Sequence, residues 1–249
     1  MIGDRKISHF YSSEPYGKHV SEALNAVDRR VDDARTVVPI SATEIRSNPY
    51  LNRRYLDPLV YRDLLTRVVF VGAMSTGKST IVEALAKKYK TTFASEYGRE
   101  YWTNNHIDRR IRIDEFDIIA RQHLINEDLA ALEADRVLFV DTNAITTYMY
   151  CLDYHGTVPD YLKQTALENG SRYDLFFLCE DDIPYDDTWD RSGPQKRRVF
   201  QKQFVADLLE RRIPFIRLSG NLAQRIAKVD AVLEAFRKFD NFLGSKVLD

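Results

Sequence analysis

The sequence predicts an α/β fold of three layers, in which helices cover both faces of a parallel sheet. Three observations support this fold class. Short apolar runs rich in β-branched and aromatic residues have the length of strands, segments with helical spacing lie between them, and the two kinds of segment alternate along most of the chain. Because strands joined through helices form right-handed β-α-β units, the strands are expected to run parallel.

The alternation is clear from Arg67 onwards. Strands are predicted at residues 67–71, in the short apolar and threonine run before Ser95, and at 137–140, 175–178 and 214–218. Helices are predicted at 81–88, 114–132, 142–152 and 194–211, and in an amphipathic segment that begins at Leu222.

The first 66 residues follow this order less clearly. One strand is predicted within Ile7–Ser12, one helix within His19–Ala26 and a second strand at Val37–Ile40. Ser41 and Glu44 have the spacing of a capping box that opens a short helix. So few elements form only a marginal core, and we therefore predict two domains, residues 1–66 and 67–249.

Composition excludes several classes of function. The chain carries 36 Lys and Arg against 37 Asp and Glu, a net charge of −1, which argues against a protein built around nucleic acid or an anionic membrane. No run of about 18 apolar residues predicts a membrane span, and the first residues lack the apolar core of a signal peptide. Cys151 and Cys179 are too few for a disulfide framework. We expect a cytoplasmic protein without nucleic-acid or membrane partners.

A phosphate-binding loop follows the first strong strand. The pattern G-x-x-x-x-G-K-[ST] is complete from Gly72 to Ser79, and it lies between a predicted strand and a predicted helix, which disfavours a chance glycine turn. The glycines let backbone N–H groups face phosphates, Lys78 supplies a cation, and the Ser79 hydroxyl can bind Mg²⁺. We assign to ATP the loop residues Gly72, Ser75, Thr76, Gly77, Lys78, Ser79 and Thr80.

The second metal-side group should be a carboxylate at the end of a neighbouring strand. Asp141 ends the run 137–140 and is the natural candidate. The alternative is that Asp141 caps the following helix, and both roles can hold at once.

Other motifs indicate what the nucleotide is used for. The chain has no Asn-Lys-x-Asp segment of a GTPase and is short for a motor or transporter ATPase, so a small-molecule kinase is favoured. Glu96 ends the predicted second strand and could accept the acceptor hydroxyl's proton or bind ribose, while Arg99 could hold a phosphate or orient Glu96. The nearby rings of Tyr97, Tyr101 and Trp102 could stack on a flat substrate. A first helical turn with core aromatics explains the same residues equally well.

A cationic lid is predicted over residues 181–198, at the carboxyl end of a strand, where ligands bind in open α/β sheets. Its cations are Arg191, Lys196, Arg197 and Arg198. Guanidinium groups that close over the site would neutralise the transferring phosphoryl group. The alternative is a polar surface loop followed by a solvated basic helix.

Five motifs together resemble the ribosylnicotinamide kinase domain of NadR-type proteins, from Arg67 to about Phe236. They are the run Gly72–Thr80, Glu96-Tyr-Gly-Arg-Glu100, Asp141-Thr-Asn-Ala-Ile-Thr-Thr147, Trp189-Asp-Arg-Ser192, and Gln195 with Arg198. The resemblance implies a P-loop kinase-like fold and ATP- and Mg²⁺-dependent phosphorylation of the 5′-hydroxyl of nicotinamide riboside, which gives nicotinamide mononucleotide in NAD salvage.

By the same resemblance, the catalytic residues are Lys78, Glu96, Asp141 and Arg191, and Ser79 and Asp141 bind the metal. Arg198 joins the ATP site from the lid. Substrate is assigned to Glu96, Tyr97, Arg99, Trp102 and Asp141. The base stays open between Glu96 and Asp141. Ser95 stands where some members have a Trp, so the ring that stacks on nicotinamide also stays open.

The N-terminal segment resembles the second half of the adenylyltransferase domain of the same proteins. The matching runs are Ser12–Gly17 and Val38–Arg46, with Ile40, Ser41, Thr43 and Arg46 in a pattern that implies a grip on ATP phosphates. The H-x-G-H motif of that family does not occur, so no adenylyltransferase activity is expected. The segment is either an α/β remnant of a nucleotidyltransferase-type domain or a piece of a longer one.

Two alternatives to the leading function stay open. One is a deoxynucleoside or nucleotide kinase, which shares the loop and the lid. The other is a non-catalytic nucleotide-binding regulator of NAD metabolism. For protein partners, a homo-oligomer and a separate chain that completes the N-terminal domain both stay open.

Overall fold

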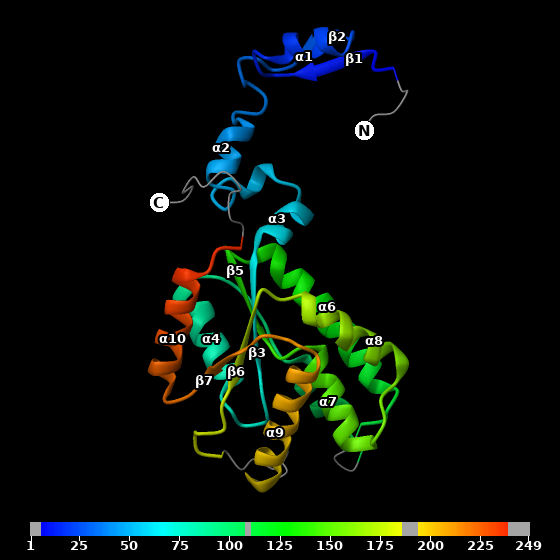
Figure 1. Cartoon of the computed structure of the whole chain (residues 1–249), viewed down its shortest axis with the longest axis vertical. Helices are drawn as coiled ribbons and strands as arrows, with labels where there is room; N and C mark the ends of the chain where they lie inside the picture. The colour runs from blue at the N-terminus through cyan, green and yellow to red at the C-terminus, as the bar shows by residue number, and fades with distance from the viewer. Residues whose placement is uncertain (1–5, 108–110, 186–193, 239–249) are drawn as a thin grey trace. The chain divides into compact units, whose positions relative to one another are not determined.

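The structure is a computed structural model that describes residues 6–107, 111–185 and 194–238 (Figure 1). The chain divides after Tyr55 into two compact units. In the described part of the chain, no helix combines the length and the apolar character needed to cross a membrane.

The smaller unit holds a two-stranded parallel sheet. Strand β1 (His9–Ser12) pairs with β2 (Val27–Arg30), and α1 (Gly17–Ala23) connects them. Helix α2 (Ala42–Ser47) follows and confirms the predicted capping box. The Glu44 N–H donates to the Ser41 hydroxyl at 3.1 Å, and the Ser41 N–H donates to the Glu44 carboxylate at 2.7 Å.

The second strand predicted at 37–40 is wrong, because that stretch is not a strand and β2 lies ten residues earlier, at Val27. The physical reason is Asp32, whose carboxylate accepts hydrogen bonds from the N–H groups of Thr36, Val37 and Val38 at 2.7, 3.1 and 2.8 Å. These N–H groups are therefore committed to a turn and cannot join a strand ladder.

The larger unit confirms the predicted fold class. Its five strands are all parallel, in the spatial order β4-β5-β3-β6-β7. Their bounds are β3 (Thr66–Val71), β4 (Phe93–Ala94), β5 (Val137–Asp141), β6 (Leu175–Cys179) and β7 (Ile216–Leu218). Because the strands are parallel, their carboxyl ends meet at one edge of the sheet, where sites of this architecture lie.

Helices cover both faces of this sheet (Figure 1). Their bounds are α3 (Pro58–Leu64), α4 (Lys78–Tyr89), α5 (Tyr97–Asn105), α6 (Glu115–Glu133), α7 (Ala144–His155), α8 (Asp160–Glu168), α9 (Pro194–Glu210) and α10 (Leu222–Ala235), with a 3₁₀ turn at Asn169–Ser171. Another 3₁₀ turn, at Arg53–Tyr55, belongs to the smaller unit. On one face, α4 and α10 bury a cluster that includes Phe70, Leu85 and Val229 against the strands. Helix α7 lies beside α6 and α8, and α9 packs on α7 through stacked rings of Tyr150 and Phe200, 4.8 Å apart.

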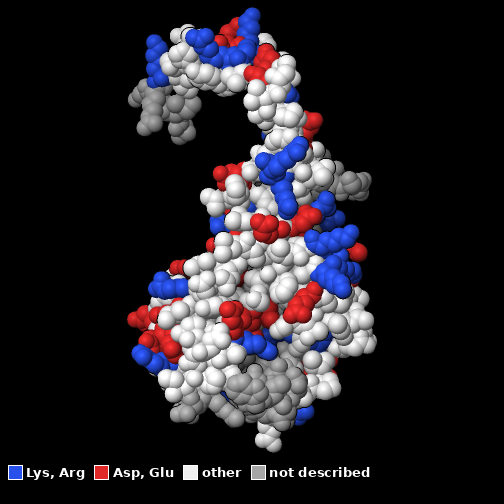
Figure 2. Space-filling model, turned by 180° about the vertical axis from the view of Figure 1, so that it is seen from behind, with Lys and Arg blue, Asp and Glu red and all other residues white. Residues whose placement is uncertain are grey.

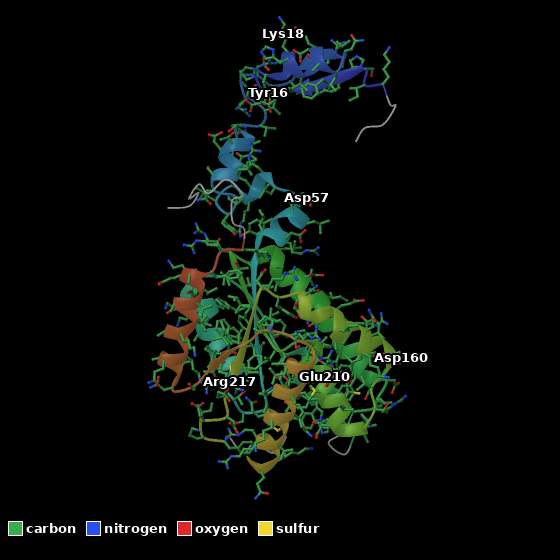
Figure 3. All side chains as sticks on the ribbon, viewed as in Figure 1. Tyr16, Lys18, Asp57, Asp160, Glu210 and Arg217 are labelled. Atoms are coloured by element: carbon green, nitrogen blue, oxygen red, sulfur yellow. The ribbon has the colours of Figure 1, made fainter. Side chains whose placement is uncertain are left out.

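Helix α3 belongs to the larger unit, although it precedes residue 67. Asp57, labelled in Figure 3, caps it by accepting a hydrogen bond from the Leu59 N–H at 2.8 Å. The buried Tyr61 hydroxyl donates to the Ala134 carbonyl at 2.8 Å. This contact ties the approach to β3 to the loop that follows α6.

Candidate active site

The phosphate loop lies between the central strand β3 and helix α4, as predicted. Gly72 and Gly77 both have positive φ, +132° and +81°, and Gly77 is the residue before α4 begins. Lys78 is buried, and its ammonium donates to the Ala73 carbonyl at 2.8 Å. The Thr76 hydroxyl donates to the same carbonyl at 2.8 Å. The lysine is therefore held inside the loop by the loop's own backbone.

Gly72 is the position where the loop approaches its neighbours most closely. A Cβ there would lie 2.8 Å from the Cys179 carbonyl oxygen, on a backbone at φ +132°. We expect Gly72→Ala to lower the free energy of unfolding by about 3 kcal/mol or more, measured by chemical denaturation, because strain and a backbone clash add.

Gly156→Ala is the matched control for this prediction. Gly156 also has positive φ, +68°, but a Cβ there would meet no atom within 4 Å. Its cost should be about 1–2 kcal/mol, from the backbone conformation alone. Equal losses in the two variants would contradict a crowded loop.

Three side chains from α9 and α10 hold the phosphate loop in place. Gln201 accepts from the Ala73 N–H at 2.7 Å and donates to the Cys179 carbonyl at 3.0 Å. Arg197 donates to the Ser75 carbonyl at 3.1 Å, and Arg225 donates to the Thr76 carbonyl at 2.6 Å. From the sequence, Arg197 was predicted only as a lid cation, and Gln201 and Arg225 were not predicted at all. The four-residue spacing of Arg197 and Gln201 does place both on one helix face.

Asp141 lies at the carboxyl end of β5, beside the loop. Burial raises the pKa of this carboxyl to about 6, the negative charge of Glu96 adds to the shift, and Lys78 and a hydrogen bond from Ser79 oppose it. Asp141 Oδ1 has no hydrogen-bond partner among the described residues. The alternative role as a helix cap is wrong, because Asn143 caps α7 by accepting from the Thr146 N–H at 3.2 Å.

The donor set fits a divalent cation. A buried carboxylate oxygen without a partner, next to a serine hydroxyl at a phosphate loop, has the oxygen chemistry and the negative charge that Mg²⁺ prefers. Clusters of three or more His, Cys, Asp or Glu side chains that could hold a metal are absent from the described residues. Any metal here would therefore need oxygen atoms from the nucleotide as well.

A pocket of about 120 Å³ opens beside the phosphate loop. Met74 of the loop and Thr142, which follows Asp141, both line it. Its full lining is Met74, Glu96, Gly98, Arg99, Trp102, Ile111, Phe116, Ile119, His123, Thr142, Thr146, Thr147, Tyr150 and Tyr154. The pocket is therefore partly aromatic and borders directly on the phosphate loop.

The predicted substrate residues divide between the pocket and the core. Glu96 and Arg99 line the pocket and form an ion pair at 3.5 Å across the start of α5. Trp102 also lines it, and its ring stacks on His106 with centroids 4.4 Å apart. Tyr97 does not belong to the lining and packs instead against the buried cluster under α5 and α6.

Several pocket residues come from helices that were not predicted from the sequence to contribute to the site. Phe116, Ile119 and His123 lie on one face of α6, with the three- and four-residue spacing that could have indicated a shared face. Tyr150 comes from α7, and burial together with the negative charge of Glu96 raises its pKa well above the usual range. No local signal in the sequence marks Tyr150 as a pocket residue.

Part of the predicted lid, residues 186–193 with Arg191, lies outside the described residues. Arg198, on α9, is exposed and lines a different hollow of about 560 Å³ together with Glu180, Asp181, Asp182, Gln201, Lys202, Val205 and Arg217. Lys196 forms an ion pair with Asp153 at 2.8 Å. Acidic and basic side chains are interspersed over the face shown in Figure 2, in line with the near-zero net charge.

The smaller unit has a hollow of its own, of about 750 Å³. Three residues of the predicted phosphate-binding pattern, Ile40, Thr43 and Arg46, line it, and Ser41 caps helix α2 beside them. Arg35 lies there too and donates to the Ile40 carbonyl at 2.7 Å. An ATP-binding role for these residues, and the absence of adenylyl transfer, stay predictions.

Comparisons with known proteins agree with this architecture. A family model described as AAA domain matches residues 67–225. The chain is 32% identical over 214 residues to the "Trifunctional NAD biosynthesis/regulator protein NadR" of Escherichia coli strain K12, and 33% identical over 212 residues to the protein of the same name in Salmonella typhimurium strain LT2. The matches cover 84% and 83% of this chain but 52% and 51% of those proteins, so the chain spans about half the length of these curated relatives.

Two solved NadR structures share the fold. One is a complex with NR, at a TM-score of 0.67 and 24% identity, which covers 96% of this chain and 72% of that one. The other is a complex with NAD and AMP-PNP, at 0.67 and 23%, which covers 94% and 69%. These findings confirm the resemblance to NadR-type proteins and the predicted fold class, while the resemblance of the N-terminal segment to half of an adenylyltransferase domain stays a prediction.

Proposed function

The chain belongs to the family described as AAA domain, and we propose that it is an ATP-dependent kinase that phosphorylates nicotinamide riboside to nicotinamide mononucleotide. One observation carries this proposal: a partly aromatic pocket lies directly beside a phosphate loop whose lysine is buried. Met74 of the loop and Thr142, after Asp141, both line that pocket. A nucleoside needs both halves: a flat cavity for its ring and a polar end where its hydroxyl meets the phosphate. The curated relatives support the choice of substrate, since NAD biosynthesis is part of their name.

On the nucleotide side, the loop residues from Gly72 to Thr80 would bind the phosphates of ATP. The Lys78 ammonium, held 2.8 Å from the Ala73 carbonyl, lies where it can stabilise negative charge on the transferring phosphoryl group. Ser79 and Asp141 would hold Mg²⁺, which, when bound, neutralises phosphate charge. Arg191 and Arg198 would add cations from the lid.

On the substrate side, Glu96 is the better candidate for the base. Glu96 lines the pocket, whereas Asp141 is buried beside the loop and is absent from the pocket lining. Arg99 forms an ion pair with Glu96 and fixes its direction. We therefore assign the acceptor hydroxyl's proton to Glu96 and the metal to Asp141, with Trp102 on the substrate ring.

Glu96→Gln should lower kcat by about 10²- to 10⁴-fold, because the amide cannot accept the hydroxyl proton, while KM changes only a few-fold. Steady-state kinetics with nicotinamide riboside measure both constants. Glu100→Gln is the matched control, since Glu100 is exposed on the same helix and is absent from the pocket lining. A kcat close to that of the unchanged chain in the Glu96 variant would move the base to Asp141.

The direct test of the proposed function is identification of the product. Incubation with ATP, Mg²⁺ and nicotinamide riboside should yield nicotinamide mononucleotide and ADP in equal amounts, by liquid chromatography with mass detection. ADP formed without the mononucleotide would contradict the proposal, because the phosphoryl group would then be going to water or to another acceptor.

A further inference from the structure

His123 lies in the apolar wall of the substrate pocket. It shares one face of α6 with Phe116 and Ile119, and Trp102 and Ile111 complete this aromatic and aliphatic wall. Two polar groups of the pocket lie instead near Asp141. Thr142 follows Asp141 directly, and Glu96 is close enough for its charge to raise the pKa of Asp141. His123 therefore adds an imidazole to the part of the pocket suited to a ring.

A buried acid lies beside one edge of this imidazole. Glu127, one helical turn further along α6, has no exposed surface, and its Oε1 lies 3.2 Å from His123 Nε2, a close charge contact that lacks the geometry of a hydrogen bond. Glu127 also accepts from the Tyr173 hydroxyl at 2.6 Å and from Arg172 Nε at 2.8 Å. Burial alone would raise the pKa of Glu127, but His123 and Arg172 outweigh it and hold the pKa below its usual value.

The charge of Glu127 favours one tautomer of His123. An ionised carboxylate only accepts hydrogen bonds, so a proton on the nitrogen that faces it, Nε2, is favoured over a lone pair there. In a neutral imidazole the other nitrogen, Nδ1, is then an acceptor. An acceptor suits a neutral amide N–H and repels a carboxylate, which has no proton to donate.

We propose that His123 recognises the carboxamide on the substrate's ring, and that it makes the enzyme prefer a ring amide over the corresponding acid. The inference rests on the proposed function, because it assumes that a pyridine riboside occupies the pocket. It adds to that function a residue that sets specificity and a reason for the buried charge at Glu127. His123 acts here as a binding residue and takes no part in proton transfer to phosphate.

The test compares nicotinamide riboside with its acid analogue, nicotinic acid riboside, as substrates. The unchanged chain should favour the amide in kcat/KM. His123→Phe should raise KM for the amide by about tenfold with little change in kcat, because one hydrogen bond to a buried partner is lost. The amide-to-acid ratio of kcat/KM should fall by a similar factor. His123→Gln, whose carbonyl can accept the amide N–H, should restore part of the affinity.

Gln122→Leu is the matched control. Gln122 precedes His123, its side chain donates to Asn126 at 2.9 Å, and it is absent from the pocket lining, so the amide-to-acid ratio should stay unchanged. A folded His123→Phe variant with an unchanged ratio would overturn the inference and leave the kinase proposal intact. If the unchanged chain phosphorylates neither riboside, the proposed function and this inference both fail.

A measurement on the unchanged chain covers the case in which His123→Phe does not fold. The ring ¹⁵N signals of His123 should show a proton on Nε2, and the Nδ1 signal should move when nicotinamide riboside is added. Saturation with the riboside without any movement of the Nδ1 signal would overturn the inference.

Discussion

A Lys78→Ala variant is expected to lose turnover by at least about 10³-fold, because it removes the cation that stabilises charge on the transferring phosphoryl group. Lys78 is 6% exposed, and its ammonium is held 2.8 Å from the Ala73 carbonyl, so its charge has a fixed position inside the loop. ADP release in the presence of nicotinamide riboside measures the loss. Thermal unfolding of the variant shows whether the fold survives.

The matched control for this variant is Lys87→Ala. Lys87 lies on the same helix α4, nine residues further along, with an exposed side chain. It should keep full turnover. Full turnover in the Lys78 variant would show that the loop from Gly72 to Ser79 is not the catalytic one.

Asp141→Asn should have two effects of opposite sign. Turnover should fall by at least about 10³-fold, since the amide removes the negative charge offered to Mg²⁺. The free energy of unfolding without ligands should rise at pH 8 by about 2–3 kcal/mol, because the asparagine resembles the protonated acid that burial favours. Chemical denaturation with and without the substitution measures the second effect.

The sign of the stability change follows from the pKa of Asp141. The folded value, about 6, lies above the ordinary value of 3.8, so the folded chain holds this proton more tightly than the unfolded chain. The unchanged chain therefore loses stability as the pH rises from about 4 to about 6, and the advantage of Asp141→Asn grows over the same range.

Asp135→Asn is the control, since Asp135 is exposed just before β5. It should change neither turnover nor the pH dependence of stability. An Asp141 variant whose stability equals that of the unchanged chain at both pH 5 and pH 8 would contradict a buried carboxyl group whose pKa is raised.

The strands of the larger unit could be predicted because burial on both faces of a parallel sheet leaves near-continuous apolar runs, as in Val68–Val71. The same reasoning was wrong at Val37–Ile40, where an apolar run is folded into a turn by the carboxylate of Asp32. Helix α8 was missed. Its first residue, Asp160, follows a proline, and its apolar positions alone form too short a pattern to separate from a loop.

Local motifs were sufficient to predict those site residues that lie together in one short segment. The phosphate loop and the placement of Glu96 and Arg99 at the pocket follow from short runs of sequence. Gln201, Arg225 and His123 could not be placed, because their partners at Ala73, Thr76 and Glu127 depend on how distant helices pack. Tertiary packing, which a single sequence does not display, decides those contacts.

The central claim is that the phosphate loop and the pocket beside it form a nicotinamide riboside kinase. Its most direct measurement is the rate of ADP release over a panel of nucleosides, with the unchanged chain, ATP and Mg²⁺ held constant. Nicotinamide riboside should stimulate ADP release well above the rate without acceptor, and thymidine should not. Stimulation by thymidine or another nucleoside, with none by nicotinamide riboside, would contradict the claim.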